Sequence, residues 1–148
     1  MFGGIALAWS ALPLELIRQH RLDRHAYERG GEREVQFLYR HRPRWLPVWH
    51  EGQLRLVLWG NRRGESRRLP CTGWTWQATV EAGTWADWGA VPVDVPATMG
   101  LENGVWYRIT QARESAEASR ACLRHAASTT RGIATASAAL TSAKPRPK

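Results

Sequence analysis

The side chains with the clearest potential for chemistry surround a short glycine-flanked turn at residues 60–64. Trp59 precedes this turn, and Arg62 and Arg63 lie inside it. A guanidinium suits a phosphate and an aromatic ring suits a base, so this combination is typical of proteins that hold a single nucleic-acid strand. The alternative is that Trp59 belongs to the core and that both arginines are only solvated. The turn is not a nucleotide-binding loop, because it lacks the G-K-[ST] and G-x-G-x-x-G patterns.

Metal and thiol chemistry have weaker support in the sequence. His20 and His25 are five residues apart, which misses the i, i+4 spacing of a helical metal site. The chain has no C-x-x-C pair, so we expect no metal site and no cofactor. Cys71 has no histidine beside it in the sequence, and we therefore expect a small buried thiol rather than a nucleophile.

Composition places the chain among folded proteins with one domain. It has 148 residues, of which 43% are hydrophobic and 23% are charged. No apolar run approaches the roughly 20 residues of a membrane span, and the two cysteines are too few for a disulfide scaffold. These features predict a cytoplasmic monomer with no membrane association. The net charge of +8 comes mainly from arginine, for which phosphate contacts and a GC-rich genome are equally good explanations.

The first 111 residues predict an α+β fold with a mostly antiparallel sheet. Apolar spacing predicts an N-terminal helix over residues 12–29, with Pro13 in its first turn and Gly30-Gly31 at its end. Alternating apolar residues and turn signals predict strands at 34–40, 46–49, 54–59, 72–79, 91–95 and 105–110. Residues 80–88 fit either a short helix or a strand.

The composition changes after Gln111. Residues 112–148 are rich in Ala, Arg, Ser and Thr and contain no aromatic side chain. Such a segment buries little apolar area and offsets little ordering entropy. We therefore expect a folded domain over residues 1–111 and a tail over 112–148, helical over 112–127 and disordered beyond Ser128.

Several short motifs occur in an order that resembles the SOS response-associated peptidase (SRAP) family. The chain opens with M-F-G-G and continues with L-P-V at residues 46–48 and L-W-G at 58–60. N-x-R-x-E-S follows at 61–66, and R-R-L-P-C-T-G-W follows at 67–74. Members of the family open M-C-G-R and carry L-P-V, R-W-G, N-x-R-x-E-T and R-R-C-L-x-P-x-x-G-[FW]-Y-E-W in the same order. The resemblance covers about residues 1–111.

The resemblance implies a barrel-like SRAP-type sheet, incomplete at the C-terminus, and single-stranded DNA binding linked to abasic-site processing in the DNA damage response. In the family, removal of the initiator Met exposes a Cys, whose α-amine and thiol form a thiazolidine with the ring-opened abasic sugar. Phe2 occupies that position here. The resemblance therefore implies DNA binding with impaired crosslinking and autopeptidase chemistry.

The resemblance also implies roles for individual residues. Asn61 matches the family asparagine that supports the nucleophile. Trp76 stands where the family has its acid–base glutamate, so Glu81 is the nearest substitute. The family's C-terminal His and R-M-P motif are absent. The expected DNA contacts are Trp59, Arg62, Arg63, Arg67 and Arg68.

Two other interpretations stay open. If the order of the motifs is chance, the chain is a small α+β interaction module with an unknown partner and no role in DNA repair. If another group such as Cys71 or Glu81 reacts, the chain is an active enzyme. Salt-dependent affinity for single strands tests the first alternative. Borohydride trapping on abasic DNA tests the second, because amine attack leaves a reducible imine.

Overall fold

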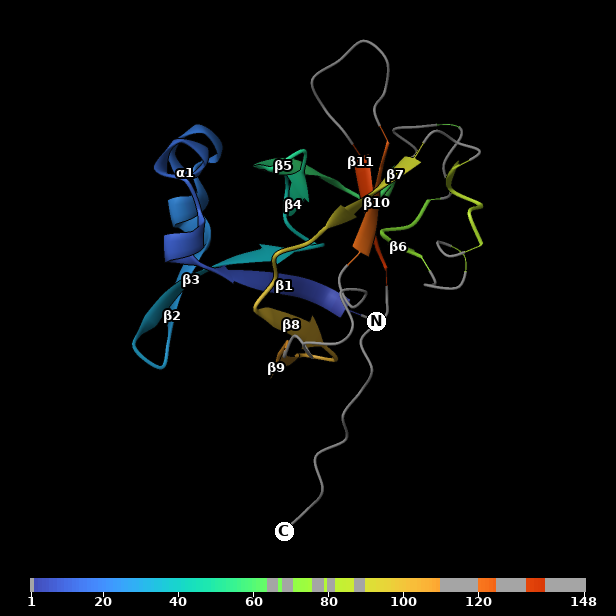
Figure 1. Ribbon diagram of the computed structural model, residues 1–148. Helices are drawn as coiled ribbons and strands as arrows, with labels where there is room; N and C mark the ends of the chain where they lie inside the picture. The colour runs from blue at the N-terminus through green and yellow to red at the C-terminus, as the bar shows by residue number, and fades with distance from the viewer. Residues whose placement is uncertain are drawn as a thin grey trace.

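The computed structural model describes residues 2–63, 67, 71–75, 79, 82–86, 90–109, 120–124 and 133–137, which form two β-sheets and one short α-helix (Figure 1). The first sheet has the order β2 (Ala26–Arg29), β3 (Glu32–Leu38), β1 (Phe2–Ala8), β8 (Met99–Glu102) and β9 (Val105–Arg108). The second has the order β10 (Arg120–Arg124), β7 (Ala90–Asp94), β4 (Trp45–His50), β5 (Gln53–Trp59), β11 (Ile133–Ser137) and β6 (Trp74–Thr75). Within these ranges only β11 pairs in parallel, so the mostly antiparallel sheet is confirmed.

The helix predicted over residues 12–29 is much shorter in the structure. The α-helix α1 spans Leu14–His20, and Arg21 then takes a left-handed conformation with φ 51° and ends it. The 3-10 turn η2 (Leu22–His25) and strand β2 follow, and a further 3-10 turn, η1 (Trp9–Ala11), precedes the helix. Residues 26–29 are a strand because Gly30-Gly31, with φ values of 58° and 81°, form a tight hairpin turn. These glycines join β2 to β3 rather than ending a helix.

Strand β1 lies in the middle of the first sheet, between β3 and β8, and was not among the predicted strands. Its side chains alternate between two faces. Ile5 and Leu7 pack into the core, whereas Gly4 and Ala6 leave the other face almost flat. A Cβ on Gly4 would lie 2.4 Å from the end of the Leu38 side chain and 3.0 Å from the Phe37 carbonyl oxygen, so a larger residue there requires Leu38 to move.

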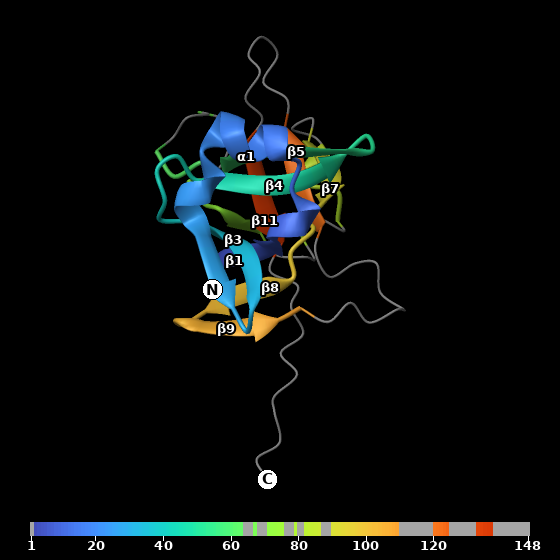
Figure 2. The same cartoon turned by 90° about the vertical axis from the view of Figure 1, so that its left-hand side faces the viewer.

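The flat face of β1 lets the first sheet curl over itself, and the β2–β3 hairpin reaches toward β9 (Figure 2). Arg29 on one edge strand lies 5.0 Å from the ring of Trp106 on the other edge strand. Arg29 also bonds the buried Glu34 carboxylate at 2.9 Å, and the Gln36 amide donates to the same oxygen at 3.0 Å. Burial raises the pKa of Glu34, but these hydrogen bonds and the Arg29 charge outweigh it and lower the pKa below its ordinary value.

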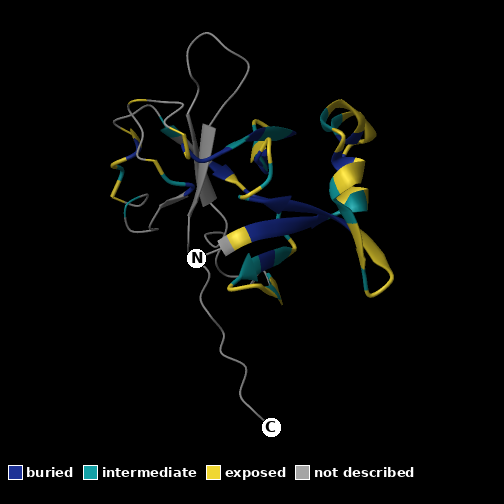
Figure 3. Cartoon of the chain, turned by 180° about the vertical axis from the view of Figure 1, so that it is seen from behind, coloured by how far each residue is buried: buried dark blue, intermediate teal, exposed yellow. Residues whose placement is uncertain are grey.

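The core lies between the first sheet and the β4–β5 hairpin, and the middle of β1 and the second part of β3 are buried there (Figure 3). Val35, Leu46, Val48 and Trp59 are fully covered there. The hairpin agrees with the predicted strands at 46–49 and 54–59. Among the described residues, no helix is long and apolar enough to span a membrane.

The tail differs from its prediction wherever the structure describes it. Residues 120–124 form β10 instead of a helix, and residues 133–137 form β11 instead of a disordered segment. The two strands pair with each other, with β7 and with β5, so the pairings β7-β4-β5-β11-β10 form a closed ring. Backbone pairing requires no large side chains, which is why a count of apolar residues missed these strands. The rest of 112–148 lies outside the described residues.

Candidate nucleic-acid interface

Trp59, the last residue of β5, is a core residue and not an exposed platform. Its exposed fraction is 0%. Its indole N–H donates to the Gly73 carbonyl at 3.0 Å, and its ring meets that of Tyr39 edge-on, with centroids 5.7 Å apart. The prediction that Trp59 stacks on a base is therefore wrong, because neither face of the ring reaches solvent.

Next to Trp59, the backbone of residues 60–61 lies very close to the backbone of residues 72–73. Gly60 has φ 69°, and a Cβ there would lie 2.4 Å from the Cα of Gly73. The backbone N–H of Asn61 donates to the Thr72 carbonyl at 2.9 Å, and the Asn61 side chain is fully buried. A glycine is thus needed at position 60 on two grounds, and Asn61 is held beside residues 72–73.

A buried arginine fixes the same turn. Arg44 is 9% exposed, and its guanidinium donates to the carbonyl of Trp59 at 2.5 Å and to that of Gly60 at 3.1 Å. The backbone N–H of Trp59 donates to the Arg44 carbonyl at 2.9 Å. Sequence reasoning missed Arg44, because nothing in the spacing separates it from the exposed arginines around it.

Tyr39 joins this turn to the first strand of the chain. Its N–H donates to the Gly3 carbonyl at 3.0 Å, while its ring contacts Trp59 and packs where a Cβ on Gly73 would lie. The guanidinium of Arg62 lies 5.6 Å from the centre of the same ring. The beginning of β1 and the Asn61 turn therefore share one partner, and that partner was also missed in the sequence.

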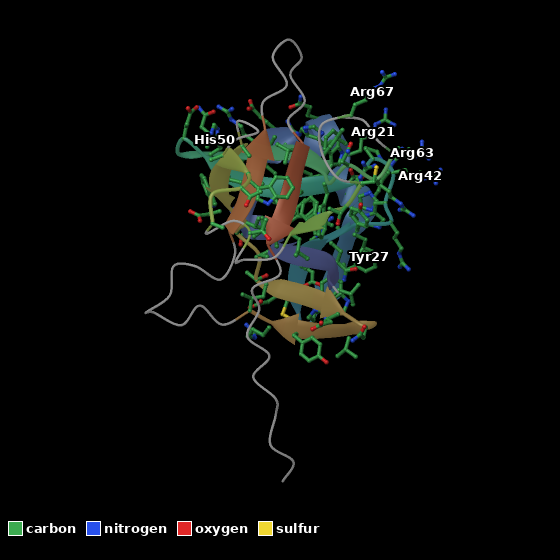
Figure 4. All side chains as sticks on the ribbon, turned by 90° about the vertical axis from the view of Figure 1, so that its right-hand side faces the viewer. Arg21, Tyr27, Arg42, His50, Arg63 and Arg67 are labelled. Carbon is green, nitrogen blue, oxygen red and sulfur yellow. The ribbon has the colours of Figure 1, made fainter. Side chains whose placement is uncertain are left out.

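Exposed arginines surround this junction and form what we call the basic face: Arg21, Arg42, Arg62, Arg63 and Arg67. Figure 4 shows Arg21, Arg42, Arg63 and Arg67 pointing outward on the same side of the molecule, with His50 on the opposite side. They come from the end of α1, the β3–β4 connection and the segment after β5. Segments far apart in sequence thus place positive charge together.

A stacked pair of imidazoles lies among the same connections. The rings of His25 and His41 have centroids 4.1 Å apart and an interplanar angle of 23°. The Leu38 N–H donates to Nδ1 of His41 at 3.4 Å, and the His41 N–H donates to the Leu38 carbonyl at 2.9 Å. Burial, then the neighbouring His25, then Arg40 lower the pKa of His41 to about 4. Burial and Arg24 also lower the pKa of His25, although Asp23 opposes them.

We expect this histidine pair to make folding pH-dependent. Between about pH 6.5 and pH 4 the unfolded chain binds a proton that folded His41 does not, so its contribution to stability falls as the pH is lowered through this window. Urea unfolding at pH 7, 5.5 and 4.5 measures the effect. His41→Asn, which keeps an acceptor for the Leu38 N–H, should show a smaller loss than the unchanged protein. Identical pH profiles for the two proteins would contradict the assignment.

The remaining predicted site residues have different outcomes. Arg62, Arg63 and Arg67 are exposed, as DNA contacts must be. Cys71 is a free, exposed thiol, so the expectation of burial is wrong. The backbone of Phe2 pairs with Glu102, whereas its side chain, Arg68, Trp76 and Glu81 lie outside the described residues. No group of His, Cys, Asp or Glu in the described part of the chain could hold a metal ion.

No protein-family model matches the chain, and neither the curated proteins nor the solved structures contain a significant match.

Proposed function

We propose that this chain binds single-stranded DNA through its basic face, as a SRAP-like protein in which the crosslinking residue is replaced. The observation that carries the proposal is the junction at Tyr39. There the first strand, which begins at the position of the family nucleophile, accepts a backbone hydrogen bond from Tyr39 through Gly3, and the Tyr39 ring contacts that of Trp59, two residues before Asn61. Arg62 lies against that ring, and exposed Arg63 follows it in the chain.

The division of roles in this proposal follows from burial. Exposed arginines contact phosphates, because a guanidinium matches a phosphate in geometry and charge. Tyr39, which is only partly buried, takes the place of Trp59 as the aromatic group nearest the strand. Arg44 and Trp59 instead hold the turn that presents these groups. Phe2 supplies no thiol, so the proposed activity is non-covalent recognition in the response to DNA damage rather than thiazolidine formation.

Direct binding measurements test the proposal. Fluorescence anisotropy with a labelled 20-nucleotide single strand and its duplex, at equal salt, should show tighter binding of the single strand. The affinity should fall linearly with the logarithm of salt concentration, because phosphate contacts release counterions. Equal affinity for the two forms, or no binding, would favour an interaction module with another partner.

Removing one phosphate contact should have a defined effect. For Arg63→Ala we expect the slope of log affinity against log salt to become shallower by about 0.7 and the affinity at 0.1 M salt to fall about 5-fold. The matched control is Arg55→Ala, which removes the same charge near the tip of the β4–β5 hairpin. Arg55 lies 3.7 Å from the carboxylate of Glu51, next to His50, which Figure 4 shows on the side opposite the labelled arginines. Equal effects of the two changes would mean that net charge alone, and not the basic face, binds the strand.

A further inference from the structure

The stacked His25–His41 pair adjoins the basic face, because His41 directly precedes Arg42 in the chain. Each ring is partly exposed, and the pair joins η2 to the β3–β4 connection. The two bonds between Leu38 and His41 fix both the backbone and the ring of His41. The rings are thus held face to face before any ligand binds. Binding a ligand therefore costs little additional side-chain entropy.

The pair is an uncharged aromatic surface within a positive environment. Arg24 and Arg40 are the cations that act on the two rings, Arg42 adjoins His41 in the chain, and Asp23 is the carboxylate on the side of η2. These surroundings disfavour a proton on either ring at neutral pH, so the rings attract a phosphate less than the arginines do. A flat, neutral π surface between cations is the arrangement on which a nucleobase stacks while its phosphates bind the arginines.

We propose that the His25–His41 pair is a base-stacking platform that continues the single-strand path from Tyr39. This inference rests on the proposed function and extends it to a second contact of a different chemical kind. His41 is two residues from Tyr39, which is at most about 7 Å of chain. Stacked nucleotides rise about 3.4 Å per step, so neighbouring nucleotides of one strand can reach both positions.

A metal ion is not the ligand that this pair fits. Nδ1 of His41 already accepts the Leu38 N–H, and the part of the chain that the structure describes brings no third ligand to the rings. A free phosphate is also disfavoured, because a neutral imidazole supplies at most one donor and no charge. The planar face of a base is the ligand chemistry that remains.

The platform can be tested by separating bases from phosphates. Two labelled 12-nucleotide strands are compared, one of thymidines and one made only of base-free deoxyribose spacers with the same phosphates. The unchanged protein should prefer the thymidine strand. His25→Leu, which removes the ring, should weaken thymidine binding by at least about fivefold and leave spacer binding and the salt slope unchanged. His25→Phe, which keeps a ring that can stack, should retain the preference.

The outcomes distinguish this inference from the proposed function. Equal affinity of the unchanged protein for both strands would leave phosphate-based DNA binding intact and overturn the platform. A preference for bases that His25→Leu does not reduce would overturn the platform as well. Absence of binding to either strand would overturn both proposals. His41→Asn, which preserves the bond from Leu38, provides the second ring-deleting variant if His25→Leu fails to fold.

Discussion

Trp59→Ala is expected to lower the free energy of unfolding by about 3–5 kcal/mol, the range for removing a large aromatic side chain from a core. Trp59 is fully buried, and its ring meets that of Tyr39 edge-on. The substitution leaves a cavity and also deprives the Gly73 carbonyl of its indole donor. Urea unfolding followed by circular dichroism measures the change.

Trp49→Ala is the matched control for this experiment. Trp49 lies on the adjacent strand β4 but is 44% exposed, so its loss should cost well under half as much. We expect Trp59→Ala to weaken DNA binding only in proportion to the fraction of chains that unfold. A Trp59→Ala protein with unchanged stability and lost DNA binding would show instead that this ring stacks on a base.

Phe2→Cys, prepared so that removal of Met1 leaves the cysteine first, is expected to form a stable adduct with an abasic single strand. The resemblance implies the chemistry: the α-amine condenses with the sugar aldehyde and releases water, and the thiol then adds to the imine carbon and closes a thiazolidine. The supporting observation is that residue 2 and Asn61 approach the same residue. Gly3 accepts the Tyr39 N–H, and the Tyr39 ring contacts Trp59, two residues before Asn61. The unchanged protein has no thiol at residue 2 and should give no heat-stable adduct.

Denaturing gels after incubation with abasic and intact strands provide the measurement. Phe2→Ser is the control, because serine is also small enough to permit removal of Met1 but has no thiol. It should give at most a borohydride-reducible imine. A heat-stable adduct of the unchanged protein would identify another nucleophile, and no adduct with Phe2→Cys would count against the SRAP-like part of the proposal.

Local patterns in the sequence were sufficient for features that depend on neighbouring residues. Alternation over residues 46–49 and 54–59 predicted the two strands of the β4–β5 hairpin, and alternation before residue 110 predicted a strand that the structure describes as β9. The exposure of Arg62 and Arg63 was also predictable, because a turn with two adjacent cations rarely becomes buried.

Only the tertiary structure decided which of two compatible interpretations holds at several residues. Two glycines such as Gly30-Gly31 can end a helix or form a hairpin turn. They form a turn here because β2 pairs with β3. A tryptophan at position 59 can belong to a core or to an exposed stacking surface. The contacts of Trp59 with Tyr39, Arg44 and Gly73 place it in the core. The rings of His25 and His41 meet only because η2 packs beside the β3–β4 connection. Burial and ring contacts depend on residues distant in the chain, so local spacing carries no information about them.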